Sequence, residues 1–292
     1  MKTEIKKIDG TKRELHIEVE GDIVNNKFDD VFKRIGQEAK VAGFRPGHVP
    51  RDVLEKHYSS QAHEQVLKEL IPDVYNQAIE KEGLDVIELP NIYDVKLSRS
   101  NLVFKAAVEV TPDVKLGNYK GIKVEYKNIE VTPEEVKRRI DSLRESRKAQ
   151  EADDNFARGL GYPGMVELEK AITQQVFLEK EGQQRHKIEE TLIETLRKQS
   201  DFKLPESMVN RQLADLLRRA KLDLALKGIA RDKIDGSEGE LRKELEPQAH
   251  SQVRTYLVLA AVARKENIPL DDGMPAKVLE FLLKEANWQQ LK

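Results

Sequence analysis

Residues suited to recognition chemistry gather in one short stretch of the sequence, AKVAGFRPGHVPRDVL, which runs from Ala39 to Leu54. It places an aromatic ring beside a guanidinium within a frame of glycines and prolines: Gly43, Phe44, Arg45, Pro46, Gly47, His48 and Pro50. Glycine permits backbone angles that other residues resist, while proline fixes φ and cannot continue a helix from upstream. The stretch is therefore a shaped turn. It either connects two helices in the ordinary way or presents the ring and the arginine to a partner.

Other residues with catalytic or ligating potential do not form a site. His57 and His63 are six positions apart, which on a helix separates them by roughly 240° around the axis, and no third ligand follows. The stretch EGDIVNNKFDD lacks the spacing of a calcium loop, and GLGYPG lacks the lysine and hydroxyl of a phosphate-binding loop. Paired carboxylates such as Glu134 and Glu135 stand at a helix start, where the helix dipole favours them. We expect no catalytic residue, no metal and no cofactor.

Composition limits the class of protein further. The chain has 292 residues, of which 35% are charged and 5% aromatic, so its cores must be aliphatic and its surface strongly solvated. The formal net charge of −2 argues against a surface built throughout for nucleic acid. There is no cysteine, which excludes disulfides and thiol chemistry. No stretch has the pattern of a signal peptide or the length of a membrane span, so we expect a cytoplasmic protein without membrane contact.

The elements that position the turn belong to an N-terminal region of mixed type. Alternating apolar and polar residues on both sides of Asp9-Gly10 predict a β-hairpin. Further periodicities predict helices over residues 25–42 and 59–83 and strands over 85–97 and 101–114. Pro50 suits an early helical position, Pro72 is expected to bend its helix, and Gly83 to end it. The region is α+β.

A connector and a helical half follow. The extended segment after residue 112 can pair a strand locally. A helix then starts at Thr132, Pro133 and Glu135 with capping chemistry, and its narrow apolar stripe needs a partner. Apolar periodicity predicts later helices over residues 166–199, 205–228, 237–267 and 275–288. Ser237 and Glu240 are expected to form a capping box. We divide the multidomain α+β chain into an N-terminal α+β domain, a connector and an all-α C-terminal domain: residues 1–111, 112–153 and 154–292.

Several of these stretches resemble one family. GFRPGHVP is similar to the ribosome-docking signature G-F-R-x-G-x-x-P of the trigger factor family, the bacterial ribosome-associated chaperones. It stands in the matching context, between two helices of an N-terminal α+β domain. The stretches VTPEEVKRRIDSLRESRK, DDNFARGLG, LPESMVNRQL and VLAAVARKENIPL resemble the family's connector helix and C-terminal helices. The resemblance covers nearly the whole chain.

The resemblance implies an ATP-independent chaperone that docks on the large ribosomal subunit near the exit tunnel. The implied docking residues are those of the signature: Gly43, Phe44, Arg45, Pro46, Gly47, His48 and Pro50. A guanidinium matches the carboxylates of a ribosomal protein and the phosphates of rRNA. The helical half would shield nascent or unfolded chains, and the family's tendency to dimerise implies self-association off the ribosome. A ribosome-independent holdase or export chaperone is the alternative, and an RNA-binding protein that uses the Arg45 loop is a more distant one.

The chain departs from the family pattern in two places. A peptidyl-prolyl isomerase domain of the FK506-binding type normally lies between the connector helix and the C-terminal helices, but here only KAQEAD joins them. We therefore expect no isomerase activity, whether the chain is a natural shortened homologue or an engineered deletion. Pro46 stands where many members have a basic residue, so docking depends more on Arg45, with His48 and Arg51 as helpers.

Overall fold

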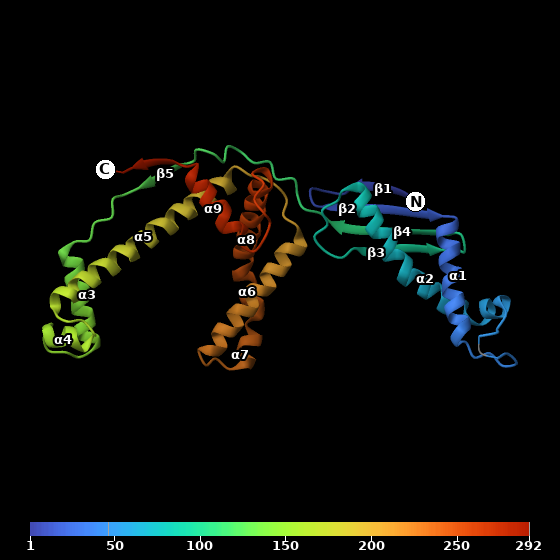
Figure 1. Cartoon of the computed structure of the whole chain (residues 1–292), viewed down its shortest axis with the longest axis horizontal. Coiled ribbons are helices and arrows are strands. Elements are labelled where there is room, and N and C mark those ends of the chain that lie inside the picture. The colour runs from blue at the N-terminus through green and yellow to red at the C-terminus, as the bar shows by residue number, and fades with distance from the viewer. Residues whose placement is uncertain (46, 292) are drawn as a thin grey trace. The chain divides into compact units, whose positions relative to one another are not determined.

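The protein begins with two strands joined by a tight turn, as the alternation around Asp9-Gly10 predicts. The computed structural model describes residues 1–45 and 47–291 (Figure 1). Strands β1 (Lys2–Lys7) and β2 (Lys12–Glu20) pair antiparallel. The Asp9 carboxylate accepts hydrogen bonds from the backbone N–H groups of Thr11 and Lys12, both at 2.8 Å. This side-chain turn reverses the chain and confirms the hairpin.

The N-terminal sheet has the strand order β1-β2-β4-β3, with β3 spanning Asn91–Leu97 and β4 Asn101–Glu109. Strands β2 and β4 are central, and alternate residues on both of them are buried. The edge strand β3 carries a register shift between Tyr93 and Lys96, where Asp94 has a φ of 54°. Such an irregularity, like the lysines of β1, keeps an edge from pairing with other chains.

Helices α1 (Asp22–Glu38) and α2 (Arg51–Glu82) form a hairpin that buries its apolar face against this sheet (Figure 1). The shared core is aliphatic with two phenylalanines from α1 and one from β4: Leu15, Ile17, Val19, Phe28, Val31, Phe32, Val66, Leu70, Leu102, Phe104 and Ala106. Gly83 ends α2 in the left-handed conformation, as predicted. A break in α2 lies at Tyr58, whose φ and ψ are −122° and 15°, while Pro72 lies inside the helix and the bend expected there stays a prediction.

The chain forms two compact units, one made of residues 1–113 and 202–253 and the other of residues 114–201 and 254–292. In the first, the Glu109 carboxylate accepts backbone N–H groups of Glu206 and Ser207 at the start of α6 (Glu206–Leu226). Pro205 offers no side-chain cap there, so a residue of the sheet supplies it. The two units were not expected from the sequence, and the division at residues 111 and 153 stays a prediction.

The remaining helices of the first unit are α7 (Arg231–Gly236) and the first part of α8 (Glu238–Lys265). The Ser237 carbonyl accepts the backbone N–H groups of Glu240 and Leu241, so the helix predicted to start at Ser237 does start there, and its capping box with Glu240 stays a prediction. The Ser237 hydroxyl donates to the carbonyl of Ile234 at 2.9 Å and so closes the end of α7. Ser237 follows a short helix that periodicity did not predict, and its hydroxyl keeps its acceptor lone pairs while it donates to that helix.

The second unit contains the predicted capping chemistry at Thr132. The Thr132 hydroxyl accepts from the Glu135 N–H, and the Glu135 carboxylate accepts from the Thr132 N–H, at the start of α3 (Pro133–Ser146). The partner that α3 needed is the pair α4 (Asp154–Gly159) and α5 (Met165–Lys198), through a small core. That core contains Ile140, Ala157, Leu168 and Ile172. Residues 147–153 alone connect α3 to α4.

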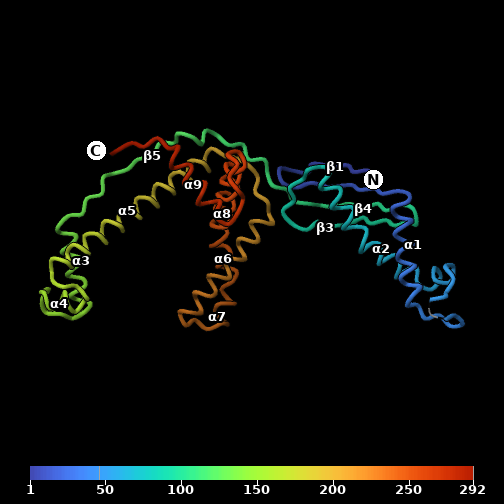
Figure 2. The backbone as a smooth tube through the Cα atoms, in the orientation of Figure 1, coloured from blue at the N-terminus to red at the C-terminus, as the bar shows by residue number. Residues whose placement is uncertain are grey.

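The end of the chain pairs with the connector. After α9 (Met274–Lys284), strand β6 (Asn287–Gln290) lies parallel to β5 (Lys123–Tyr126), and Figure 2 shows the two segments side by side. The connector was expected to pair locally, but its partner is more than 150 residues away. Together the sheet, the helices and the two units confirm the predicted multidomain α+β class.

Candidate functional site

The stretch singled out in the sequence forms the loop of the α1–α2 hairpin, and two turns shape it. The Phe44 N–H donates to the carbonyl of Val41 at 3.1 Å, and the His48 N–H donates to that of Arg45 at 3.0 Å. Gly43 and Gly47 are the third residues of these turns, with φ of 88° and 83°. A type II turn requires positive φ at this position, which explains why both are glycine.

The loop exposes its tip and buries its ends. Phe44 is 40% exposed, and Arg45, His48 and Pro50 also face solvent. Ala39 and Val49, at the two ends, are buried in the core of the N-terminal region. Among the residues that the structure describes, none forms an ion pair with Arg45. Pro46 was also predicted to belong to this site, and it lies outside the described residues.

Arg51, expected to assist Arg45, is instead occupied at the base of the loop. Its guanidinium lies 4.0 Å from the centre of the Phe32 ring and pairs with Asp29 at 2.9 Å and with Glu55 at 2.7 Å. Arg99, from the β3–β4 turn, also pairs with Glu55. The two arginines, Arg51 first, hold the pKa of Glu55 below its ordinary value. These contacts attach the start of α2 to α1 and to the sheet. The base of the loop, called the stem below, is therefore held in a fixed position.

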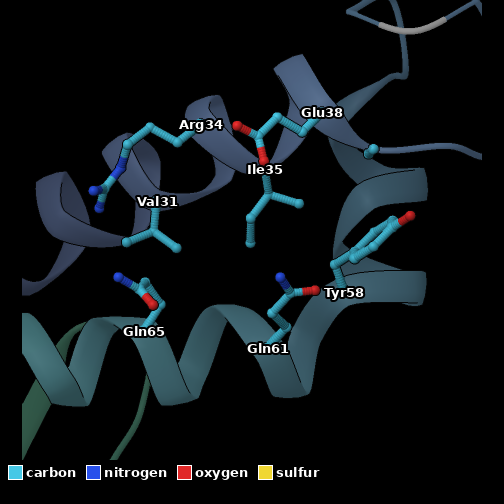
Figure 3. A pocket seen from close by; sticks show the side chains of 8 residues that line it. Val31, Arg34, Ile35, Glu38, Tyr58, Gln61 and Gln65 are labelled. Carbon is cyan, nitrogen blue, oxygen red and sulfur yellow. The ribbon is translucent and has the colours of Figure 1, made fainter.

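A pocket of about 310 Å³ opens between α1 and α2, next to the loop. Figure 3 shows side chains of the two helices pointing toward one another across it. It is lined by Val31, Arg34, Ile35, Glu38, Ala39, Tyr58, Gln61 and Gln65. The Tyr58 hydroxyl donates to the carbonyl of Lys40 at the entry to the loop, at 3.4 Å. On the pocket's flank, hydrogen bonds from Gln65 and Arg34 lower the pKa of Glu69 to about 2.

The structure thus brings together all described members of the predicted site, and it adds residues that the sequence did not indicate. Asp29, Glu55 and Arg99 brace the stem, yet they come from three different elements and share no motif. Elsewhere, the described residues contain no cluster of three potential metal ligands and no helix long and apolar enough to cross a membrane.

Comparisons with known proteins point to one family. The family model described as bacterial trigger factor protein matches residues 1–143, and the model of the trigger factor C-terminus matches residues 164–291. Trigger factor of Halalkalibacterium halodurans is 23% identical over 378 residues, which cover 94% of this chain and 88% of that protein. Trigger factor of Bacillus licheniformis is 36% identical over 147 residues, which cover 50% of this chain and 35% of that protein.

A solved structure has the same fold. It is a trigger factor chaperone studied for promiscuous substrate recognition in folding and assembly, with a TM-score of 0.61 and 15% identity. The match covers 98% of this chain and 100% of that chain. The 378 aligned positions of the H. halodurans protein exceed the 292 residues of this chain, so that relative carries positions without a counterpart here. Residues 144–163, matched by neither family model, contain the direct connection from α3 to α4.

Proposed function

Since the chain belongs to the trigger factor family, we propose that it is a cytoplasmic, ATP-independent chaperone that docks near the ribosomal exit tunnel and shields nascent chains. The observation that carries the docking step is the loop tip. Phe44 and Arg45 face solvent while the stem beneath them is held by the contacts of Arg51. A ring and a guanidinium presented without rearrangement lose little entropy on binding.

The shielding step is supported by large apolar side chains that remain exposed on helices of both units, on the segments that connect them and on strand β6. They are spread singly among charged residues, so each offers a weak contact while the protein stays in solution. They include Val166, Leu178, Leu222, Leu226, Ile229, Leu270 and Trp288.

Ribosome pelleting at increasing salt tests the docking step. Replacing Phe44 and Arg45 together by alanine should abolish co-sedimentation with 70S ribosomes and leave suppression of aggregation within twofold. The matched control replaces Leu226 and Arg231, an exposed apolar residue and an exposed cation on another hairpin, and should pellet normally. If the loop variant pellets like the unaltered protein, docking through this loop is excluded, and if neither protein pellets, a ribosome-independent holdase is favoured.

We also propose that the chain does not catalyse prolyl isomerisation. The short join at residues 147–153 leaves no room for the aromatic-lined cavity that such a reaction needs. A proline-containing tetrapeptide assay should give the uncatalysed rate at any protein concentration. A rate that rises with protein concentration would overturn this part of the proposal.

A further inference from the structure

Strand β6 pairs along one edge only. Asn287 and Leu291 donate their backbone N–H groups to carbonyl oxygens of the segment that contains β5, both at 2.9 Å. Alternate residues of a paired strand face the same neighbour, so Trp288 and Gln290 turn their N–H and C=O groups toward the opposite edge. In the part of the chain that the structure describes, no strand pairs with that edge.

An apolar groove of about 500 Å³ lies beside this strand. It is lined by Leu178, Glu181, Gly182, Gln184, Arg185, Ile188, Leu283 and Trp288. Leu178 is 54% exposed and Trp288 46%. The Trp288 ring is held in place because its indole N–H donates to the carbonyl of Leu283 at 3.0 Å, and because its ring packs edge-to-face with that of Tyr126, with 5.9 Å between the ring centroids. The groove therefore has a preformed aromatic wall.

Gly182 makes part of the lining from helix backbone. It lies in the interior of α5, where glycine is less favourable than alanine, and no heavy atom within 4 Å would meet a side chain there. Helix packing therefore does not explain the glycine. An absent side chain deepens the groove and lets another chain approach the helix closely.

Taking the proposed chaperone function as its basis, we propose that the free edge of β6 captures an extended segment of an unfolded polypeptide as a third strand. Residues in register on neighbouring strands share a face, so the captured residue beside Trp288 points to the same side as the indole, into the groove. The backbone of an unfolded chain supplies hydrogen-bond donors and acceptors that complement the backbone N–H and C=O groups of Trp288 and Gln290. A lipid surface does not supply such a row of donors and acceptors. Because only these two residues face the edge, binding is weak and reversible.

Trp288 reports on this site directly, because it is the single tryptophan of the chain. The probe is a tryptophan-free peptide of alternating leucine and serine with lysines at both ends, titrated while tryptophan emission is recorded. We expect a saturable change. Two analogues of the peptide carry methylated backbone nitrogens, one at the leucines and the other at the serines, so that each has one of its two hydrogen-bonding edges blocked. One analogue should bind at least tenfold more weakly than the other. Equal binding of both analogues, or unchanged emission, would overturn the inference.

Two variants test the edge and the groove separately. Gln290→Pro removes an N–H that faces away from β5 and should weaken peptide binding at least fivefold. Gly182→Met fills the groove and should do the same, whereas Gly239→Met, at another helical glycine with open space around it, should not. Circular dichroism checks that the helices are retained. Peptide binding unaltered in Gln290→Pro or in Gly182→Met overturns the inference.

Failure of this inference is distinguishable from failure of the proposed function. If the unaltered protein suppresses aggregation but the peptide does not bind beside Trp288, the inference falls and the chaperone function stands. If the unaltered protein neither suppresses aggregation nor pellets with ribosomes, the proposed function falls. If Gln290→Pro converts a dimer to a monomer in sedimentation while peptide binding is unchanged, the occupant of the edge is a second copy, and the inference is overturned.

Discussion

Two helical hairpins of the first unit present side chains to solvent in different ways. At the α1–α2 loop, two glycine-containing turns expose one ring and one guanidinium, Phe44 and Arg45. At the α6–α7 connection, the exposed apolar residues Leu222 and Leu226 lie on the helix itself, and Leu226 is 78% exposed. A defined pair on a shaped tip suits one partner that is always the same. Aliphatic side chains on a helix suit many partners that bind weakly.

The stems of the two hairpins differ in the same sense. Arg51 combines two ion pairs with a position over the Phe32 ring, and it connects α2 to α1. The other hairpin has Lys221, which pairs with Asp235 at 3.2 Å and with Glu238 at 2.5 Å at the surface. A planar guanidinium on an aromatic ring holds a fixed geometry, whereas an exposed ammonium on a flexible stem holds a looser one. Under the proposed function, the more rigid geometry belongs to the hairpin whose partner is always the same.

The strongest test of this difference exchanges one glycine in each hairpin. Gly47 and Gly228 both have positive φ, 83° and 81°, and both have open space around them. Gly47→Val should lower ribosome affinity at least tenfold, because valine resists this backbone region by roughly 1–2 kcal/mol and the turn must rearrange. Gly228→Val imposes the same strain on the other hairpin and should leave affinity within twofold. Equal effects in salt-titrated pelleting would show that the loop geometry is not specific.

A smaller effect is expected from the stems. Arg51→Met removes two ion pairs and the contact with Phe32, and should destabilise α1 and α2 by about 1–2 kcal/mol and weaken docking about threefold. Hydrogen exchange of the α1 and α2 amides measures the first effect and pelleting the second. Lys221→Met is the counterpart and should leave both measurements unchanged. Unchanged exchange in Arg51→Met would mean that the stem is not braced by this residue.

Replacing the exposed leucines should affect suppression of aggregation and not ribosome pelleting, which is the reverse of the effect expected for the loop variants. Leu222→Ser with Leu226→Ser removes two apolar contacts from α6 and should reduce suppression of aggregation about twofold, since many weak sites share the task. Pelleting should be unaffected, and stability should change by less than about 0.5 kcal/mol because both side chains are exposed. A loss of pelleting in this double variant would contradict the separation of the two roles.

The turn geometry of the α1–α2 loop could be predicted from sequence because its chemistry is local. Glycine at the third position of a turn and prolines that stop helices act within a few residues, as do the turn at Asp9 and the capping box at Thr132. Even so, the sequence could not show whether Phe44 faces solvent, since tertiary contacts of the loop decide that.

What could not be predicted depends on distant partners. The brace of Arg51 includes Glu55 on its own helix but also Arg99 from the β3–β4 turn, 48 positions away. Strand β6 has four exposed residues, and only its pairing with β5 makes it a strand. The short helix α7, with a single buried residue, has too few turns to produce a period, so periodicity did not predict it. For the Arg51 brace and for β6, long-range contacts decided between local alternatives.

The smallest effect concerns pH, and its sign differs between the two hairpins. The pKa of Glu69, between α1 and α2, is lowered from 4.5 to about 2 by Gln65 and Arg34. A lowered pKa means that the folded state prefers the carboxylate, so this stabilisation is complete above pH 4.5 and is lost as pH falls toward 2. Glu69→Gln should therefore cost roughly 1 kcal/mol at pH 7, after allowance for solvent screening, and only a small part of that at pH 2.

The α6–α7 hairpin should show the reverse dependence. The pKa of Lys221 is raised above 10.5 by Glu238 and then by Asp235, so its stabilisation is present below that value and is lost as pH rises through the folded pKa. Hydrogen exchange of α2 and α6 amides at pH 3 and pH 7, each corrected for intrinsic exchange rates, compares the hairpins. From pH 7 to pH 3, the α2 amides should lose more protection in the unaltered protein than in Glu69→Gln. The change in protection of the α6 amides over the same range should be the same in the unaltered protein and in Lys221→Met. If the α2 amides lose the same protection at low pH in the unaltered protein and in Glu69→Gln, Glu69 is not the acid-sensitive contact of the α1–α2 hairpin.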